Sequence, residues 1–128
     1  MEIMPFLKIL LVEDSPADSR LLWEMLRDSG IKSRFSLDPA VTLKDALSQL
    51  SSRKFDLVLL DGWKDLYLPM LALLRPKLRR GSVVCADNIF TFKKDLAPYV
   101  AHVNDPANGF RSMTLPLGSG LEYSVCVG

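Results

Sequence analysis

The chain has 128 residues, of which 48% are hydrophobic and 24% charged, and its formal net charge is +1. This length suits one compact domain over residues 1–128 with an ordinary core, and the composition excludes a disordered chain. The basic residues are scattered or stand beside acids, which excludes the dense positive face of a nucleic-acid binder.

The apolar run within the N-terminal stretch MEIMPFLKILLVEDS is too short to span a bilayer. It also lacks a basic leader and a small-residue cleavage site, so we expect a buried first strand and no membrane partner. Cys85 and Cys126 each lie in an apolar, strand-like run. We expect two reduced core thiols, which fits a cytoplasmic protein.

The first predicted strand is the continuous apolar run at 7–12. A helix of about four turns should follow, because Ser15 can cap it, Pro16 fits its first position and Gly30 can end it. A weaker strand is predicted at 33–37.

The second predicted helix opens at Thr42, where Asp45 completes an acidic variant of the capping box. Residues 55–60 form the next buried strand. Residues 66–78 are rich in leucine with a helical period, and Pro76 should break the last turn.

The C-terminal part continues with a predicted strand at 82–86 and a short helix at 95–103. Two strand-like runs around Leu-Gly-Ser-Gly indicate a closing hairpin. Repeated alternation of strand and helix predicts an α/β fold with a mostly parallel sheet, built as a three-layer α/β/α sandwich.

The N-terminal half resembles a response-regulator receiver domain. The resemblance rests on KILLVEDSPADSRLL, with the acidic pair Glu13-Asp14, and on Asp61 in VLLD, at the phosphoacceptor position. It implies that these acids hold Mg²⁺. The chain departs from the family after this point, since Cys85 and Ala86 stand where a Ser or Thr is needed, and no Lys-Pro pair occurs.

From residue 55 onward the chain is similar to metal-dependent O-methyltransferases of the catechol type, through DLVLLDGWKDLYLP, GSVVCADN and GSGLE. The resemblance implies Mg²⁺ ligands at Asp61, Asp87 and Asn88, and a base for the substrate hydroxyl at Lys64. The loop after the first strand, EDSPADS, lacks the glycines with which this family binds S-adenosylmethionine. We therefore do not expect methyl transfer.

The two resemblances meet in FDLVLLD, and recombination of two folds is the simplest explanation. Residues 1–61 would then be the receiver-derived half and residues 62–128 the methyltransferase-derived half of a flavodoxin-like and Rossmann-like hybrid. If each half keeps its neighbours, the strand order is 2-1-3-4-6-5, with strand 6 antiparallel.

An acidic cluster is expected at the carboxyl edge of three neighbouring strands. Its members are Glu13, Asp14, Asp61, Asp87 and Asn88. One interpretation is a weak site for Mg²⁺, Mn²⁺ or Ca²⁺, and the favoured one is a solvated acidic rim. His102 has no second His or Cys at ligand spacing, so we expect no metal role for it.

Other candidate residues have a structural and a functional interpretation. Lys64 is expected to act as a counter-ion to Asp61 or Asp65 rather than as a base. Trp63 and Tyr67 are expected to pack rather than to form a substrate wall.

The function predicted at this point is a folded chimera without evolved activity, and hence no enzyme. No catalytic residue is expected, and Lys64 and Asp61 would be vestigial. No cofactor or partner would be required, although Mg²⁺ could bind weakly, and uncovered apolar surface would favour a homodimer. Two alternatives are a receiver, as an Asp61 phosphoacceptor or an interaction module, and a remnant of an S-adenosylmethionine-dependent O-methyltransferase.

Overall fold

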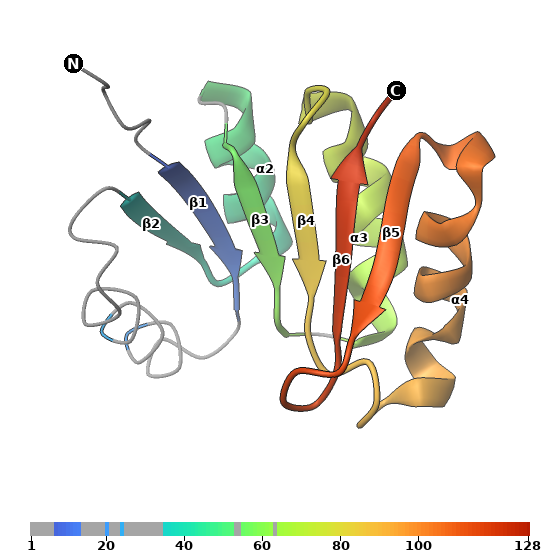
Figure 1. The fold of residues 1–128 in the computed structure, drawn as a ribbon. Coiled ribbons are helices and arrows are strands. Elements are labelled where there is room, and N and C mark those ends of the chain that lie inside the picture. The colour runs from blue at the N-terminus through green and yellow to red at the C-terminus, as the bar shows by residue number, and fades with distance from the viewer. Residues whose placement is uncertain (1–6, 14–19, 21–23, 25–34, 53–54, 63) are drawn as a thin grey trace, which may run out of the picture.

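The structure is a computed structural model in which one six-stranded sheet organises the chain (Figure 1). It describes residues 7–13, 20, 24, 35–52, 55–62 and 64–128. The strands are β1 (Leu7–Val12), β2 (Phe35–Ala40), β3 (Leu57–Leu60), β4 (Val83–Ala86), β5 (Phe110–Leu115) and β6 (Leu121–Cys126).

The strand order is β2-β1-β3-β4-β6-β5, as predicted. Strands β1 to β4 pair in parallel, and β6 is antiparallel to both β4 and β5. Strand β3 is hydrogen-bonded to β1 on one side and to β4 on the other. The predicted fold class and the inserted antiparallel strand are therefore confirmed.

Three α-helices in the described part of the chain cover one face of this sheet (Figure 1). They are α2 (Leu43–Ser52), α3 (Tyr67–Leu74) and α4 (Lys93–Asn104). Helix α3 contacts both α2 and α4, so the three form one layer. The helix predicted from Ser15 falls almost entirely outside the described residues.

Local sequence signals explain where these helices begin and end. The Thr42 hydroxyl accepts a hydrogen bond from the backbone N–H of Asp45 at 3.0 Å, which is the predicted cap of α2. Helix α3 ends at Leu74 and tightens into a 3₁₀ turn over Arg75–Lys77. Pro76 lies in that turn, so the predicted break is present and the helix is shorter than expected.

Strand β2 differs most from its prediction. It runs to Ala40 rather than ending at 37, because it pairs with β1 along its whole length, from Leu7 opposite Phe35 to Val12 opposite Ala40. Pro39 is tolerated there because β2 is an edge strand. Pairing with a neighbour therefore extended a segment whose own sequence favoured a strand weakly.

The hydrophobic core lies between the sheet and the helical layer. Buried strand residues such as Leu10, Val58 and Val84 meet buried helix residues such as Leu71 and Leu96. Cys85 and Cys126 are buried free thiols, as predicted. None of the helices within the described ranges is long and apolar enough to cross a membrane.

The opposite face of the sheet carries exposed apolar side chains near β5 and β6. Met113 and Tyr123 stand opposite each other in the two strands and are 57% and 36% exposed. The next cross-strand pair, Thr114 and Glu122, lies on the helical side, where Asn104 of α4 contacts Glu122. Because successive side chains alternate between faces, Met113 and Tyr123 point away from the described helices.

Candidate metal and substrate site

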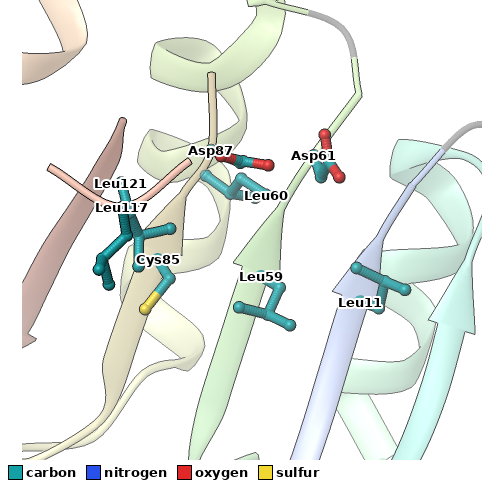
Figure 2. A pocket seen from close by; sticks show the side chains of 8 residues that line it. All are labelled: Leu11, Leu59, Leu60, Asp61, Cys85, Asp87, Leu117 and Leu121. Atoms are coloured by element: carbon teal, nitrogen blue, oxygen red, sulfur yellow. The ribbon is translucent and has the colours of Figure 1, made fainter. Parts of the chain in front are cut away.

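The candidate site lies where β3 and β4 end. Asp61 directly follows β3, and Asp87 and Asn88 directly follow β4. The backbone N–H of Asp87 donates to the carbonyl of Leu60 at 3.0 Å, which extends the parallel ladder and holds the two strand ends together. Figure 2 shows the Asp61 and Asp87 carboxylates at these two neighbouring ends. Ligands of open α/β sheets bind at this edge.

Asn88 connects the two carboxylates. Its side-chain Nδ2 donates to Asp61 Oδ1 at 3.0 Å, and its backbone N–H donates to Asp87 Oδ1 at 2.8 Å. Its φ of +70° makes it the one non-glycine residue of the described ranges in the left-handed region. Asparagine tolerates that conformation better than most residues. The turn aims its amide back across the sheet edge at Asp61.

The loop between β5 and β6 brings a further polar group to this place. The hydroxyl of Ser119 lies 3.3 Å from Asp87 Oδ1 and 3.2 Å from Asn88 Oδ1. Ser119 lies in the motif GSGLE but is not among the residues predicted from the sequence. Its distance of more than 30 positions from its partners along the chain gives no local signal.

Backbone contacts fix this loop to the segment after β4. Ile89 N–H donates to the carbonyl of Gly120 at 3.1 Å, and Phe90 N–H donates to that of Ser119 at 2.8 Å. Gly120 has a φ of +91°, and a Cβ there would lie 2.7 Å from the Phe90 ring. Glycine is therefore required for the two loops to meet.

Tyr67 connects the segments that follow β3 and β4 through its hydroxyl, and the expectation that it packs is confirmed. Its side chain is 1% exposed, and its hydroxyl accepts from the N–H of Gly62 and donates to the carbonyl of Asp87, both at 3.3 Å. Burial raises its pKa, so it stays a neutral phenol. Trp63, the other aromatic candidate, lies outside the described residues.

Lys64 begins the short 3₁₀ turn Lys64–Leu66 just after Asp61. Its ammonium lies 4.8 Å from the centroid of the Phe92 ring, within reach of a cation–π interaction. The ring therefore holds the end of this flexible side chain. Its predicted roles, counter-ion or base, stay predictions.

A cavity of about 260 Å³ adjoins the two carboxylates (Figure 2). Its lining residues are Leu11, Leu59, Leu60, Asp61, Cys85, Asp87, Leu117 and Leu121. Burial raises the pKa of the Cys85 thiol to about 11, so this thiol is neutral at pH 7. The cavity thus combines an apolar wall with carboxylate oxygens at one end, which is the usual composition of a small-molecule site.

Of the two remaining predicted ligands, Glu13 and Asp14, only Glu13 lies within the described residues. Glu13 is buried and directly follows β1. It lies next to Asp61 in the sheet, because the backbone N–H of Asp61 donates to the carbonyl of Val12, the residue before Glu13, at 3.0 Å. Asp14 lies outside the described residues. Within the described ranges no three His, Cys, Asp or Glu side chains gather as a metal-binding group. The described candidate ligands are therefore two carboxylates and an amide, with the Ser119 hydroxyl beside them, and their metal role stays a prediction.

Glu122 is a second polar residue that sequence reasoning missed. It is completely buried on the helical side of β6, where Ser112 and Thr114 donate their hydroxyls to its carboxylate and Asn104 Nδ2 donates at 3.0 Å. These hydrogen bonds offset the hydration that the carboxylate loses on burial.

Comparison with known proteins places this architecture among the methyltransferases. No family model matches the chain. The catechol O-methyltransferase of Sus scrofa is 29% identical over 131 residues, which cover 98% of this chain and 67% of that relative. The Bos taurus enzyme is 30% identical, over 77% of this chain and 38% of its own length, and the Mus musculus enzyme 33%, over 66% and 34%.

Solved structures give the same fold. An SAH-bound methyltransferase of Podospora anserina matches with a TM-score of 0.64 at 15% identity, over 94% of this chain and 72% of its own. An O-methyltransferase of Bacillus cereus in complex with SAH matches with a TM-score of 0.60 at 14% identity, over 93% and 73%. The sheet with its inserted antiparallel strand is therefore a Rossmann-like methyltransferase fold.

These findings correct the functional expectations. A recombined chain without activity, and with it the absence of an enzyme, is wrong, because catechol O-methyltransferase similarity crosses residue 61 and covers nearly the whole chain. The same findings speak against a receiver or a designed chimera as the main interpretation. The expectation that no cofactor is required conflicts in part with the SAH held by two neighbours, whereas Mg²⁺ stays compatible.

Proposed function

We propose that the chain acts as a divalent-cation-dependent O-methyltransferase on a hydroxyl group of a catechol-type diol, with S-adenosylmethionine as methyl donor. The observation that carries the proposal is the convergence of Asp61, Asp87 and Asn88 at two adjacent strand ends beside an apolar cavity. The names of the relatives supply the substrate class, and the SAH of the structural neighbours supplies the cofactor class.

The donor set suits Mg²⁺. Carboxylate and amide oxygens are the hard ligands that this ion prefers, and the left-handed backbone of Asn88 is a strain of the kind that accumulates at functional sites. Asp61, Asp87 and Asn88 would hold the ion. A bound cation there would favour the deprotonated form of a substrate hydroxyl.

The cofactor would occupy the carboxyl edge near β1, where the cavity wall reaches Leu11. S-adenosylmethionine supplies an activated methyl group when bound. The sequence carries no glycine between Val12 and Gly30. Binding there would therefore depend on side chains more than on close backbone approach, and cofactor binding is a separate quantity to measure.

The residues of the chain would divide the work as follows. Lys64, whose side-chain end lies over the Phe92 ring, would take the proton of the reacting hydroxyl in its neutral amine form and become the ammonium. The leucine wall formed by Leu59 and Leu121 would hold the substrate ring and exclude water. Tyr67 would keep the turn at Gly62 and the end of β4 in register.

The test is methyl transfer to catechol in the presence of S-adenosylmethionine and Mg²⁺, followed by mass spectrometry of the product. We expect methylated catechol from the wild type, loss of product on chelation, and a decrease of at least about 10-fold to 100-fold in Asp61→Asn, since that is the range for losing only a partner of a metal ligand. Asp95→Asn, an exposed acid in the first turn of α4, is the control and should keep full activity. A wild type without product, or an Asp61→Asn variant with unchanged rate, would refute the proposal.

A further inference from the structure

The hydroxyl of Ser119 occupies an unusual place, between the side chains of two proposed metal ligands. It lies 3.3 Å from Asp87 Oδ1 and 3.2 Å from Asn88 Oδ1. Both atoms are oxygens that could face a cation, and one hydroxyl group has one proton for the two of them. Ser119 is therefore a neighbour of the ligands that no part of the proposed mechanism yet uses.

The amide of Asn88 faces the wrong way for a metal ion between the two carboxylates. Its Nδ2 group donates to Asp61 Oδ1 at 3.0 Å, which leaves its oxygen toward Ser119. A carboxylate only accepts hydrogen bonds, so it is the NH₂ end of the amide that faces Asp61. A cation held by Asp61 needs the amide oxygen at that end, so the amide has to turn over.

A hydroxyl can serve both orientations because it donates and accepts. In the orientation in which Nδ2 of Asn88 faces Asp61, Ser119 donates to the amide oxygen of Asn88. After the amide has rotated, Ser119 accepts from Nδ2, and its proton remains available to Asp87 Oδ1. An aliphatic side chain in this place would leave one end of the amide without a protein partner in either state.

We propose that Ser119 is a positioning residue for the cation site, which can hold the Asn88 amide both in the orientation that donates to Asp61 and in the opposite one, which presents the amide oxygen to a cation. The inference rests on the proposed function, because it assumes that Asp61 and Asn88 bind the ion. It couples the loop of residues 116–120 to metal binding, although that loop supplies no ligand itself.

The loop is built to keep this serine in place. Phe90 N–H donates to the carbonyl of Ser119 itself at 2.8 Å, and Ile89 N–H donates to the carbonyl of Gly120 at 3.1 Å. These bonds connect Ser119 to the segment that directly follows Asn88. The hydroxyl and the amide are thus held relative to one another by backbone, which fixes their distance while the amide turns.

The first test is the affinity of the chain for Mn²⁺ and Mg²⁺ by calorimetry, without cofactor or substrate. Ser119→Ala should weaken binding by about 10-fold, the lower end of the range for a partner of a metal ligand. Ser119→Thr keeps the hydroxyl and should restore most of the affinity. Ser51→Ala, which removes an exposed hydroxyl bonded to the Leu47 carbonyl in α2, is the control and should leave binding unchanged.

The second test separates amide orientation from simple support of the loop. In an Asn88→Asp background the side chain has two equivalent oxygens and no orientation to choose, and Asp also tolerates the left-handed backbone. Ser119→Ala should then change Mn²⁺ affinity by less than about threefold, so the two substitutions are coupled in a double-mutant cycle.

Unchanged affinity in Ser119→Ala, equal weakness of the Thr variant, or the same loss in both backgrounds would overturn the inference. In each case a wild type that binds Mn²⁺ leaves the proposed function standing. A wild type that binds neither ion would instead refute the metal site on which the proposed function depends.

Discussion

Replacement of Tyr99 by phenylalanine should stabilise this protein. Tyr99 of α4 is 1% exposed, and its buried hydroxyl has no hydrogen-bond partner within the described part of the chain. Burial and the nearby Glu122 carboxylate raise its pKa, so the hydroxyl is neutral and only its lost hydration matters. Its ring packs edge-on against Tyr67, with centroids 5.8 Å apart and planes at 74°. Phenylalanine keeps that packing and removes the unsatisfied group.

The magnitude follows from the cost of an unsatisfied buried polar group, which is about 1–3 kcal/mol. We expect Tyr99→Phe to raise the free energy of unfolding by about 1 kcal/mol, the lower end, since the core can relax around a hydroxyl. For a domain of this size the melting temperature should rise by about 3–5 °C.

Tyr67→Phe is the matched control, because it belongs to the same ring pair and its hydroxyl is bonded. Loss of its bonds to Gly62 and Asp87 should lower the free energy of unfolding by about 1–2 kcal/mol. Urea unfolding followed by circular dichroism measures both variants, with unchanged m-values as the check on two-state behaviour. A Tyr99→Phe variant that is destabilised like Tyr67→Phe would refute the reasoning.

Three further predictions concern a turn, a thiol and a surface. Gly120→Ala should destabilise by at least about 1–3 kcal/mol in urea unfolding, the cost of a left-handed backbone alone, because its Cβ would also meet Phe90. Burial raises the pKa of Cys85 from 9.0 to about 11 on folding, so the stabilisation that its neutral thiol gives the folded state is complete below pH 9 and is lost as the pH rises toward 11. Cys85→Ala should therefore make the free energy of unfolding depend less on pH between pH 9 and pH 11. Met113→Lys with Tyr123→Lys should reduce dimerisation in sedimentation velocity, since these exposed apolar side chains favour self-association.

Controls for these predictions come from the same elements. Gly118 has a φ of +54° and open space where a Cβ would lie, so Gly118→Ala should lower the free energy of unfolding less than Gly120→Ala does. Equal losses would contradict the predicted contact. Leu73→Lys changes an apolar residue on α3 that is also exposed, and it should leave self-association unaltered. A wild type that sediments only as a monomer would remove the homodimer prediction.

The strands were predictable because their signals are local, and their order was predictable from the strand neighbours that the two family resemblances imply. Continuous apolar runs mark β1, β3 and β4, and the Leu-Gly-Ser-Gly turn marks the closing hairpin. The C-terminal limit of β2 was not predictable, since its last residues become strand only through pairing with β1. The expectation of no activity was wrong, because it rested on two partial resemblances and on the missing glycine pattern after β1, whereas catechol O-methyltransferase similarity covers nearly the whole chain.

The sequence by itself determined which residues end β3 and β4, and so brought Asp61, Asp87 and Asn88 to one edge of the sheet. Alternation of apolar runs with helical segments suffices for that, because parallel strands align their carboxyl ends. Only the tertiary structure decided the left-handed turn at Asn88, the contact of Ser119 with the ligands and the burial of Glu122. Each of these depends on hydrogen-bond partners from distant segments, and the residues adjacent in sequence do not indicate those partners.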